Sequence, residues 1–281
     1  MTETPAHMTP LAYAHEPESA YFTSGAWGSS SAKQSLTSPR KAMDAMSGLD
    51  RTESDAFDLG SAVDQTLCPC PHARPSVIRP KEIDGRTKEG KAWLAEHAGH
   101  NVISAEHGRI IAMITDRMPK PIKTMLSMAA EVQGFQRVFR TIDAESGLAV
   151  QCRFDILRGD QPYDLKTTSS TLEDWPRSAW TYGYAFQAAW YGWVAGLCGW
   201  KLAPMRYLVV ETKSPWRSCI YTPDSDWLAA GEAQRILAVE RLAQAERTGD
   251  WSDHGDLDRI LTIPRWALKP GSTAGDLPAF E

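Results

Sequence analysis

Two strand-like segments joined by a glycine-containing turn constrain the fold of this chain more than any other feature. In the first segment, every second residue from 150 onward is apolar: Val150, Cys152, Phe154 and Ile156. Residues 158–161 supply a turn, and residues 163–168 form the second segment. Alternation with a period of two is typical of a strand that buries one face. The sequence therefore predicts an antiparallel hairpin within a sheet.

Three charged residues mark one end of this hairpin. Asp155 lies late in the first segment, and Asp164 and Lys166 lie in the second. Because side chains alternate along a strand, Asp164 and Lys166 share a face, and an antiparallel return brings Asp155 close to Asp164. Two neighbouring carboxylates are costly to bury unless a cation compensates their charge. By itself, however, an Asp-x-Lys sequence more often forms an exposed cross-strand ion pair.

The chemistry of these side chains points to a magnesium site. Mg²⁺ prefers hard oxygen ligands, commonly one or two carboxylates together with a substrate phosphate, and we expect Mn²⁺ to substitute for it. A bound divalent ion lowers the pKa of a water and stabilises the charge that develops on phosphoryl oxygens. Lys166 would orient the attacking water or help to deprotonate it. The pattern therefore predicts phosphodiester hydrolysis at Asp155, Asp164 and Lys166.

The remaining segments indicate one α/β domain. Residues 1–30 are rich in Ser, Thr, Pro, Gly and Ala without periodicity, which predicts a flexible arm before a single domain over residues 31–281. Further strands are expected near Phe135 and over residues 207–211. Helices are expected over residues 31–45, from Gly60 behind an Asp58 cap, over residues 88–97, after Ser104, as one long helix through residue 197, and over residues 225–247.

Composition narrows the compartment and the partners. A net charge of −5 disfavours non-specific coating of nucleic acid. The basic residues between 74 and 91 would supply the local positive charge that a DNA-binding cleft needs, or else form a solvated face. The five cysteines have no repeated spacing, and Cys68, Cys70 and His72 lack a second ligand pair for a zinc finger. Without an apolar run of about 20 residues, no membrane span is expected. We therefore expect a cytoplasmic protein.

A second motif follows the hairpin. Gln187 and Tyr191 are four residues apart, so they share one face of a helix and can face the same site. Together with Asp155 and the Asp164-Leu165-Lys166-Thr167-Thr168 sequence, this pair resembles the RecE-like branch of the PD-(D/E)xK exonucleases, found in phage recombination modules. Without that hairpin, an amide and a phenol on an aromatic helix would be read as core residues.

The resemblance extends over about residues 30–270. Gly60, Ser61 and Ala62 match a helix in which the family carries a metal-binding His, but Asp64 stands at that position here. Glu131 resembles a family acid that precedes the first strand and faces the metal. Downstream, matches with the family pattern occur at Glu211, Pro215 and Trp266.

The resemblance implies a restriction-endonuclease-like α/β core, with a central mixed sheet flanked by helices. It implies metal ligation by Asp155, Asp164, the Leu165 carbonyl, Asp64 and Glu131, with Glu131 also counted among the catalytic residues. DNA contacts are implied for Gln187, Tyr191, Thr167 and Thr168. The implied activity is degradation of linear duplex DNA from the 5′ end, leaving a 3′ tail for a single-strand annealing protein. Such enzymes are often homo-oligomers.

Two other functions compete with this interpretation. A RecB-like exonuclease would act on single strands, and its iron–sulfur form is disfavoured because the chain lacks three C-terminal cysteines. A non-catalytic DNA-end-binding protein would retain the fold without needing Asp155, Asp164 and Lys166. Metal-dependent hydrolysis separates the enzyme from the binding protein.

Overall fold

The computed structural model describes residues 11–49 and 55–252, and residues through Trp251 form one compact unit. Residues 1–10 of the expected arm and the Trp266 segment lie outside the described residues. Across the described part, no helix has both the length and the apolar character needed to cross a bilayer.

A six-stranded mixed sheet forms the centre of this unit, with the strand order β1-β4-β5-β6-β7-β8. Its β6–β7 pair is parallel, and its other neighbouring pairs are antiparallel. A separate parallel pair consists of β2 (Ser76–Ile78) and β3 (Asn101–Ile103). The strands of the central sheet are β1 (Leu11–Ala14), β4 (Phe135–Ile142), β5 (Ala149–Arg158), β6 (Gln161–Thr168), β7 (Arg206–Glu211) and β8 (Ser218–Tyr221). The expected α/β class with a central mixed sheet is confirmed.

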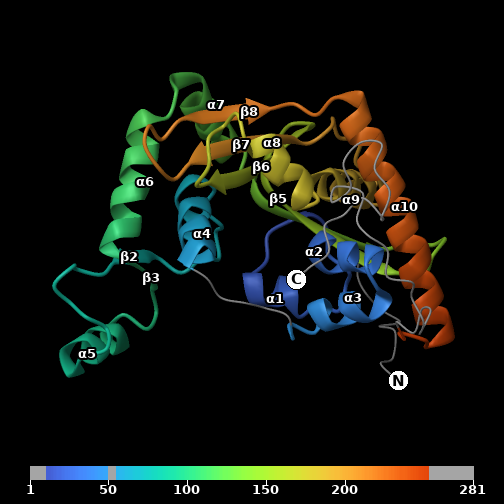
Figure 1. Cartoon of the computed structure of the whole chain (residues 1–281), viewed down its shortest axis with the longest axis horizontal. Helices are drawn as coiled ribbons and strands as arrows, with labels where there is room; N and C mark the ends of the chain where they lie inside the picture. Colours follow the sequence, from blue (N-terminus) through green and yellow to red (C-terminus); the bar gives the residue numbers. More distant parts are fainter. Residues whose placement is uncertain (1–10, 50–54, 253–281) are drawn as a thin grey trace, which may run out of the picture. The chain divides into compact units, whose positions relative to one another are not determined.

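Helices flank both faces of the sheet (Figure 1). In chain order they are α1 (Glu18–Phe22), α2 (Ser29–Ala32), the 3-10 turn η1 (Lys33–Leu36), α3 (Pro39–Met46), α4 (Asp55–Leu67), α5 (Lys88–Glu96), α6 (Ala105–Arg117), α7 (Lys120–Glu131), α8 (Trp175–Thr181), α9 (Tyr184–Leu197) and α10 (Ser225–Thr248). Ser104 caps α6 as expected, because its hydroxyl accepts a hydrogen bond from the His107 N–H across 3.1 Å.

Each face of the sheet has its own apolar core. One core joins β4, β5 and β7 to α9 and α10, and its largest fully buried side chains include Trp190, Phe186 and Phe154. The other joins α4, α6 and α7 to the opposite face through Ile156, Leu165 and similar residues. Trp27, Trp175 and Trp190 are buried in the first of these cores, as expected for large apolar rings, whereas Trp180 and Trp200 are exposed.

The alternation along β5 changes near Asp155. Val150, Cys152 and Phe154 belong to the core beneath α9, but Ile156 belongs to the opposite core. The prediction that these four share one face is therefore wrong at Ile156. Across the β4–β5 ladder, Gln136 lies opposite this point with φ +52°, a left-handed conformation that interrupts the regular pleat.

The N-terminal segment is packed where it is described. Strand β1 pairs with β4, and Trp27 is 1% exposed, with its indole N–H donating to Glu246 across 2.8 Å. The prediction of a flexible arm is therefore wrong for residues 11–30. Composition misled here because the anchoring depends on a few aromatic side chains, such as Tyr21 and Trp27, within a Ser- and Gly-rich context.

Three helix boundaries differ from expectation, each for a local reason. The long helix is divided into α8 and α9 by Gly183, whose φ of +73° breaks the helical backbone. The helix expected over residues 31–45 is divided at Ser38, which caps α3 ahead of Pro39. Asp58 lies inside α4, which begins at Asp55, so it is not the cap.

Candidate active site

The β5–β6 hairpin opens at its charged end. The β-ladder pairs Ile156 with Tyr163, and the strands part beyond that pair, where Asp155 and Asp164 follow. Past this point β6 continues beside β7, with Asp164 opposite Tyr207. Because β5 no longer pairs there, the Leu165 N–H donates instead to the Asp155 carboxylate across 2.7 Å. The opening thus places Asp155 and Asp164 beside a part of the β6 backbone with which β5 does not pair.

Asp164 is held from two sides. The Gln187 side-chain amide on α9 donates to Oδ1 across 2.8 Å, and the Lys166 ammonium lies 2.5 Å from Oδ2. Asp164 is 2% exposed, and Oδ2 has no hydrogen-bond partner apart from this ion pair. Lys166 also lies over the Tyr184 ring, 4.6 Å from its centroid. Helix α9 therefore fixes both members of the Asp-x-Lys motif.

A third carboxylate approaches from α4. The Gln136 amide on β4 donates to both oxygens of Asp64, across 3.1 and 3.0 Å. The left-handed backbone of Gln136 is a costly conformation for a residue other than glycine, and such strain is often found at functional sites.

Helix α4 also contacts β6 through a glycine. Gly60 lies against Thr167, since a Cβ added at Gly60 would meet the Thr167 hydroxyl at 3.5 Å. Helix α4 therefore packs directly against the end of β6.

Burial and neighbouring charges shift the pKa values of Asp64, Asp155 and Lys166. Burial raises the pKa of Asp64 to about 7, and the Asp164 charge adds to this effect. Burial also raises the pKa of Asp155, with further contributions from the Asp164 and Asp64 charges. For Lys166, burial alone would lower the pKa, but the charges of Asp164, Tyr184 and Asp155 and the hydrogen bond to Asp164 together raise the pKa above its usual value. The raised pKa values of Asp64 and Asp155 mean that additional negative charge beside Asp164 is unfavourable unless a cation offsets it, and Lys166 alone does not do so.

The donor set fits a hard divalent cation in its chemistry. Asp64, Asp155 and Asp164 offer only oxygen donors, and uncompensated carboxylates attract such an ion. Within residues 11–49 and 55–252, however, no three His, Cys, Asp or Glu side chains are gathered closely enough to hold a metal ion by themselves. Each carboxylate is instead held by a protein donor: Gln136, the Leu165 N–H, or Gln187 with Lys166.

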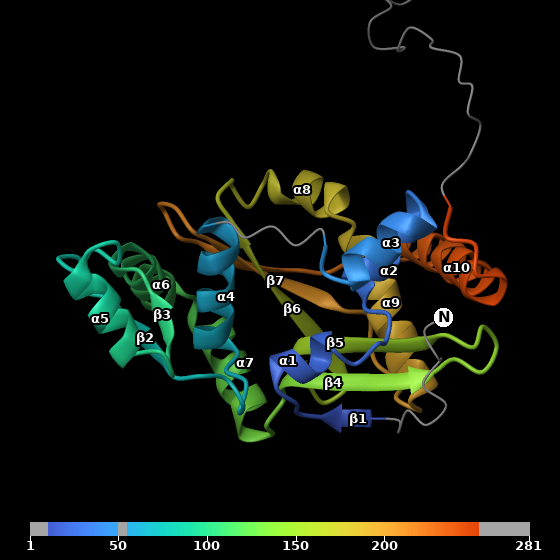
Figure 2. The ribbon, with the colours of Figure 1, turned by 90° about the horizontal axis from the view of Figure 1, so that it is seen from below.

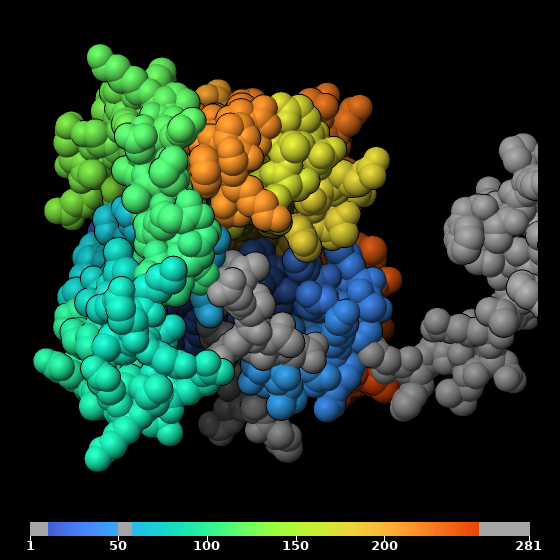
Figure 3. Space-filling view, turned by 60° about the vertical axis from the view of Figure 1, so that its left-hand side comes forward, coloured from blue at the N-terminus to red at the C-terminus, as the bar shows by residue number. Residues whose placement is uncertain are grey.

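These residues line one cleft of about 1190 Å³, large enough for several nucleotide-sized groups. In the space-filling view, the cyan segment that includes α5 and the blue N-terminal helices lie on opposite sides of the face shown (Figure 3). Of the expected catalytic, metal-binding and DNA-binding residues, those that line the cleft are Asp64, Asp155, Asp164, Leu165, Lys166, Thr167, Gln187 and Tyr191. Tyr191 is buried against Phe154, and burial raises its pKa, so its hydroxyl stays protonated at neutral pH.

Two other expected site residues do not line the cleft. Glu131 is the last residue of α7 and is exposed, away from the three aspartates, so the structure does not support its assignment as a metal ligand. The residue that reaches the cleft from this part of the chain is Gln136, five positions later. Thr168 is buried, and its hydroxyl accepts from the Ser170 N–H, while its carbonyl accepts from the Thr212 N–H.

Sequence reasoning missed Gln136 and Arg153. Both face the cleft from the strands β4 and β5. Arg153 precedes Asp155 by two positions, a spacing that places both side chains on the same face of a strand and could have revealed it. For Gln136 no such signal existed, because its position depends on a left-handed backbone within a strand.

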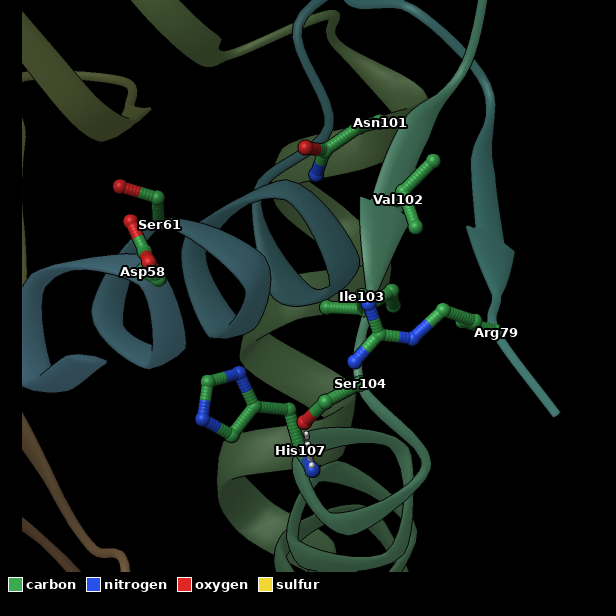
Figure 4. Close-up of a pocket in the computed structure, with 8 residues that line it drawn as sticks. All are labelled: Asp58, Ser61, Arg79, Asn101, Val102, Ile103, Ser104 and His107. Carbon is green, nitrogen blue, oxygen red and sulfur yellow. Dashed lines mark hydrogen bonds between the residues drawn. The ribbon is translucent and has the colours of Figure 1, made fainter. Parts of the chain in front are cut away.

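A smaller cavity of about 280 Å³ adjoins the cleft, since Ser61 and Asn101 line both. It lies between α4, β3 and the start of α6 (Figure 4). Arg79 and His107 face it from one side and Asp58 from the other. Arg79 brings a positive charge to the lining of this cavity, and Asp58 brings a negative one.

Comparison with known proteins agrees with this geometry. The crystal structure of a protein from Eubacterium rectale, named "putative exonuclease", has a similar fold, with a TM-score of 0.56 and 16% sequence identity over 89% of this chain and 96% of that chain. No curated protein matches the sequence. Residues 28–260 match the family described as the PDDEXK-like domain of unknown function (DUF3799). The chain therefore belongs to this PDDEXK-like family.

Proposed function

We propose that this chain is a divalent-metal-dependent exonuclease that hydrolyses phosphodiester bonds of linear duplex DNA. The observation that carries the proposal is the meeting of Asp155, Asp164 and Lys166 in one large cleft, where the β5–β6 hairpin opens. Membership of a PDDEXK-like family supports it, as does the name of the structural neighbour from Eubacterium rectale.

The carboxylates of Asp155 and Asp164 and the Leu165 carbonyl are the residues we assign to hold the ion, with Asp64 as a further ligand from α4. Mg²⁺ bound there supplies a positive charge for the phosphoryl oxygens and a lower pKa for a bound water. Gln187 keeps Asp164 in position through its 2.8 Å hydrogen bond, and Gln136 does the same for Asp64. Hydrogen bonds of this kind determine how well the ligating carboxylates are oriented toward the metal ion.

Lys166 provides the remaining positive charge. Its ammonium is protonated at neutral pH, since the Asp164 carboxylate raises its pKa. A protonated lysine donates hydrogen bonds, so we assign it to the attacking water and the developing negative charge on phosphate. The Tyr184 ring beneath the ammonium limits the directions in which Lys166 can turn. Thr167, Gln187 and Tyr191 line the path of the DNA strand.

The finer assignment follows from the resemblance to RecE-like exonucleases. It comprises 5′-to-3′ polarity, production of 3′ single-stranded tails, delivery to a strand-annealing protein in phage-type recombination, and assembly into a homo-oligomer. The motif that supports it is the hairpin sequence together with Gln187 and Tyr191 on one face of α9.

End-labelled DNA tests this proposal. Linear duplexes with blunt ends or overhangs, single strands and closed circles are incubated with Mg²⁺, with Mn²⁺ and with chelator. We expect label release from the 5′ ends of linear duplex in either metal and none with chelator. Lys166→Ala and Asp164→Ala should abolish release while melting near the wild-type temperature. Cleavage of closed circles, or hydrolysis that survives chelation, would contradict the assignment.

A further inference from the structure

Arg153 brings a positive charge to the wall of the cleft beside the carboxylates. It precedes Asp155 by two residues on β5, and both side chains line the cleft. Two residues along a strand span about 6.6 Å. The charge also acts on α4, because it counteracts the rise in the pKa of Asp64. A DNA strand with one phosphate at the carboxylates therefore has a neighbouring phosphate within reach of the long arginine side chain.

Helix α1 determines the direction of this side chain. The guanidinium carbon of Arg153 lies 5.1 Å from the centroid of the Tyr21 ring, within the range of a cation–π contact. Tyr21 is itself buried, so the ring that supports the guanidinium is fixed by its own packing. Figure 2 shows α1 beside β5, in agreement with this contact. The charge is therefore held on the α1 side of the cleft.

Few other cations are available to a polyanion in this cleft. Within the described ranges, its lining Lys and Arg side chains are Arg74, Arg153 and Lys166. The Lys166 ammonium lies 2.5 Å from the Asp164 carboxylate. Arg74 is exposed, and its guanidinium donates to the Ala98 carbonyl across 3.5 Å. Because phosphate binding depends on Lys and Arg, and the planar fork of arginine matches phosphate oxygens, Arg153 is suited to this contact.

The ion pair of Arg153 is weak enough to be replaced. Its ion-pair partner among residues 11–49 and 55–252 is Glu18 of α1, 3.6 Å away, which is too long for a hydrogen bond. The Glu18 side chain is 58% exposed, whereas that of Arg153 is 19% exposed. Such a pair contributes little, since water already surrounds the acid. A phosphate that accepts two hydrogen bonds from the guanidinium makes a stronger, charge-assisted contact.

We propose that Arg153 binds the backbone phosphate next to the scissile one, on the α1 side of the cleft, and that this phosphate displaces Glu18 from the guanidinium. The contact deepens the proposed nuclease function and rests on it. A backbone phosphate carries no base identity, so the contact is independent of sequence. It fixes the register of the strand, which places the scissile phosphate at Asp155 and Asp164.

A binding experiment tests this contact without requiring turnover. Full-length chain carrying Lys166→Ala is titrated, in Mg²⁺, with linear DNA in which one phosphate at a time is an uncharged methylphosphonate. We expect binding to weaken about 10- to 100-fold at two neighbouring positions, the scissile phosphate and the next one. Adding Arg153→Gln should weaken binding of unmodified DNA by a similar factor and remove the effect at the second position alone. It should also lower the slope of log K against log salt by about 1.

Three further variants serve as controls for charge and fold. Arg153→Lys keeps the charge without the planar fork and should retain part of the methylphosphonate effect, which also gives a reading if Arg153→Gln melts early. Arg74→Gln removes another cation from the lining and should leave the effect at the Arg153 position intact. Glu18→Gln removes the competing acid and should tighten binding about 2- to 5-fold.

The outcomes separate this contact from the nuclease itself. An equal methylphosphonate effect at every position with Arg, Lys or Gln at residue 153 overturns the contact, even if the wild-type chain degrades DNA. Weaker binding by Glu18→Gln contradicts the displacement of Glu18. A phosphate position that depends on Arg153, without hydrolysis by the wild type, contradicts the proposed nuclease alone. Failure to bind DNA contradicts both.

Discussion

The side-chain amide of Gln187 donates a hydrogen bond to the Asp164 carboxylate across 2.8 Å, joining the second turn of α9 to strand β6. This contact holds Oδ1 of the acid, while the Lys166 ammonium lies beside Oδ2. The two residues are 23 positions apart in the sequence, so their meeting depends on the packing of α9 against the sheet.

The first prediction concerns that amide. Gln187→Ala should lower kcat/KM on linear duplex about 10- to 100-fold, the range typical for loss of a residue that orients a metal ligand. The melting temperature should change little because Gln187 is only partly buried. Gln244→Ala, at an exposed position on α10, is the matched control and should behave as wild type. Undiminished turnover in Gln187→Ala would show that Asp164 needs no such support.

The second prediction separates the acids by their metal dependence. Asp155→Ala should abolish activity at all Mg²⁺ concentrations, since Asp155 lies at the opening of the hairpin beside Asp164. Asp64→Ala, on a separate helix, should raise the Mg²⁺ concentration for half-maximal rate about 10-fold while leaving measurable turnover. Magnesium titrations of the initial rate measure both effects. Identical titration curves for Asp64→Ala and wild type would exclude Asp64 as a ligand.

The third prediction concerns stability and pH at Glu211. This carboxylate is 2% exposed and accepts hydrogen bonds from the Arg217 side chain and backbone N–H and from the Leu172 N–H. The hydrogen-bonded Arg217 guanidinium holds its pKa below the ordinary 4.5. Glu211→Gln should lower the free energy of unfolding by about 1–3 kcal/mol at pH 7, because buried donors lose a charged acceptor.

The sign of the pH dependence follows from that lowered pKa. The stabilising contribution of Glu211 is full above the unfolded-state pKa and is lost as the pH falls through the folded-state pKa. The difference between wild type and Glu211→Gln in urea unfolding should therefore shrink as the pH falls from 7 toward 3. Glu173→Gln, on the exposed side of the same guanidinium, is the control and should cost less than about 1 kcal/mol. A difference that grows in acid would contradict this account.

The fourth prediction concerns the contact between α9 and α10. A Cβ added at Gly231 would lie 2.1 Å from the Ala185 carbonyl oxygen, so Gly231→Ala must push the two helices apart. We expect it to lower the free energy of unfolding by about 1–3 kcal/mol. Gly196→Ala on α9 meets nothing within 4 Å and should instead stabilise by about 0.5–1 kcal/mol, since alanine favours a helix. Denaturant unfolding of both variants measures the contrast.

Local patterns were sufficient for the β5–β6 hairpin and for part of the site. The alternation around Phe154 predicts the hairpin, and the four-residue spacing of Gln187 and Tyr191 predicts a shared helix face. Both rest on geometry that repeats along the chain. The resemblance added Asp64, whose approach to the hairpin from α4 no local pattern could have indicated.

Other features depend on single conformations that the sequence does not mark. Gln136 reaches Asp64 only through a left-handed residue within β4, whereas the expected acid Glu131 does not line the cleft. The parallel pair β2 and β3 consists of three-residue strands, too short to show alternation. The sequence around Gly183 does not distinguish it from a residue inside one aromatic helix, and only its positive φ shows that the helix is divided there.

The edge strand β1 has a practical consequence for expression of the protein. A chain from which residues 1–30 are removed, as its composition would suggest, loses both strand β1, which pairs with β4, and helix α1. Strand β4 would then present unpaired peptide groups along a segment that is buried in the intact chain, which is a template for association between molecules. Shortened versions should therefore aggregate, and the N-terminal residues from Leu11 onward must be kept in any preparation meant for assays.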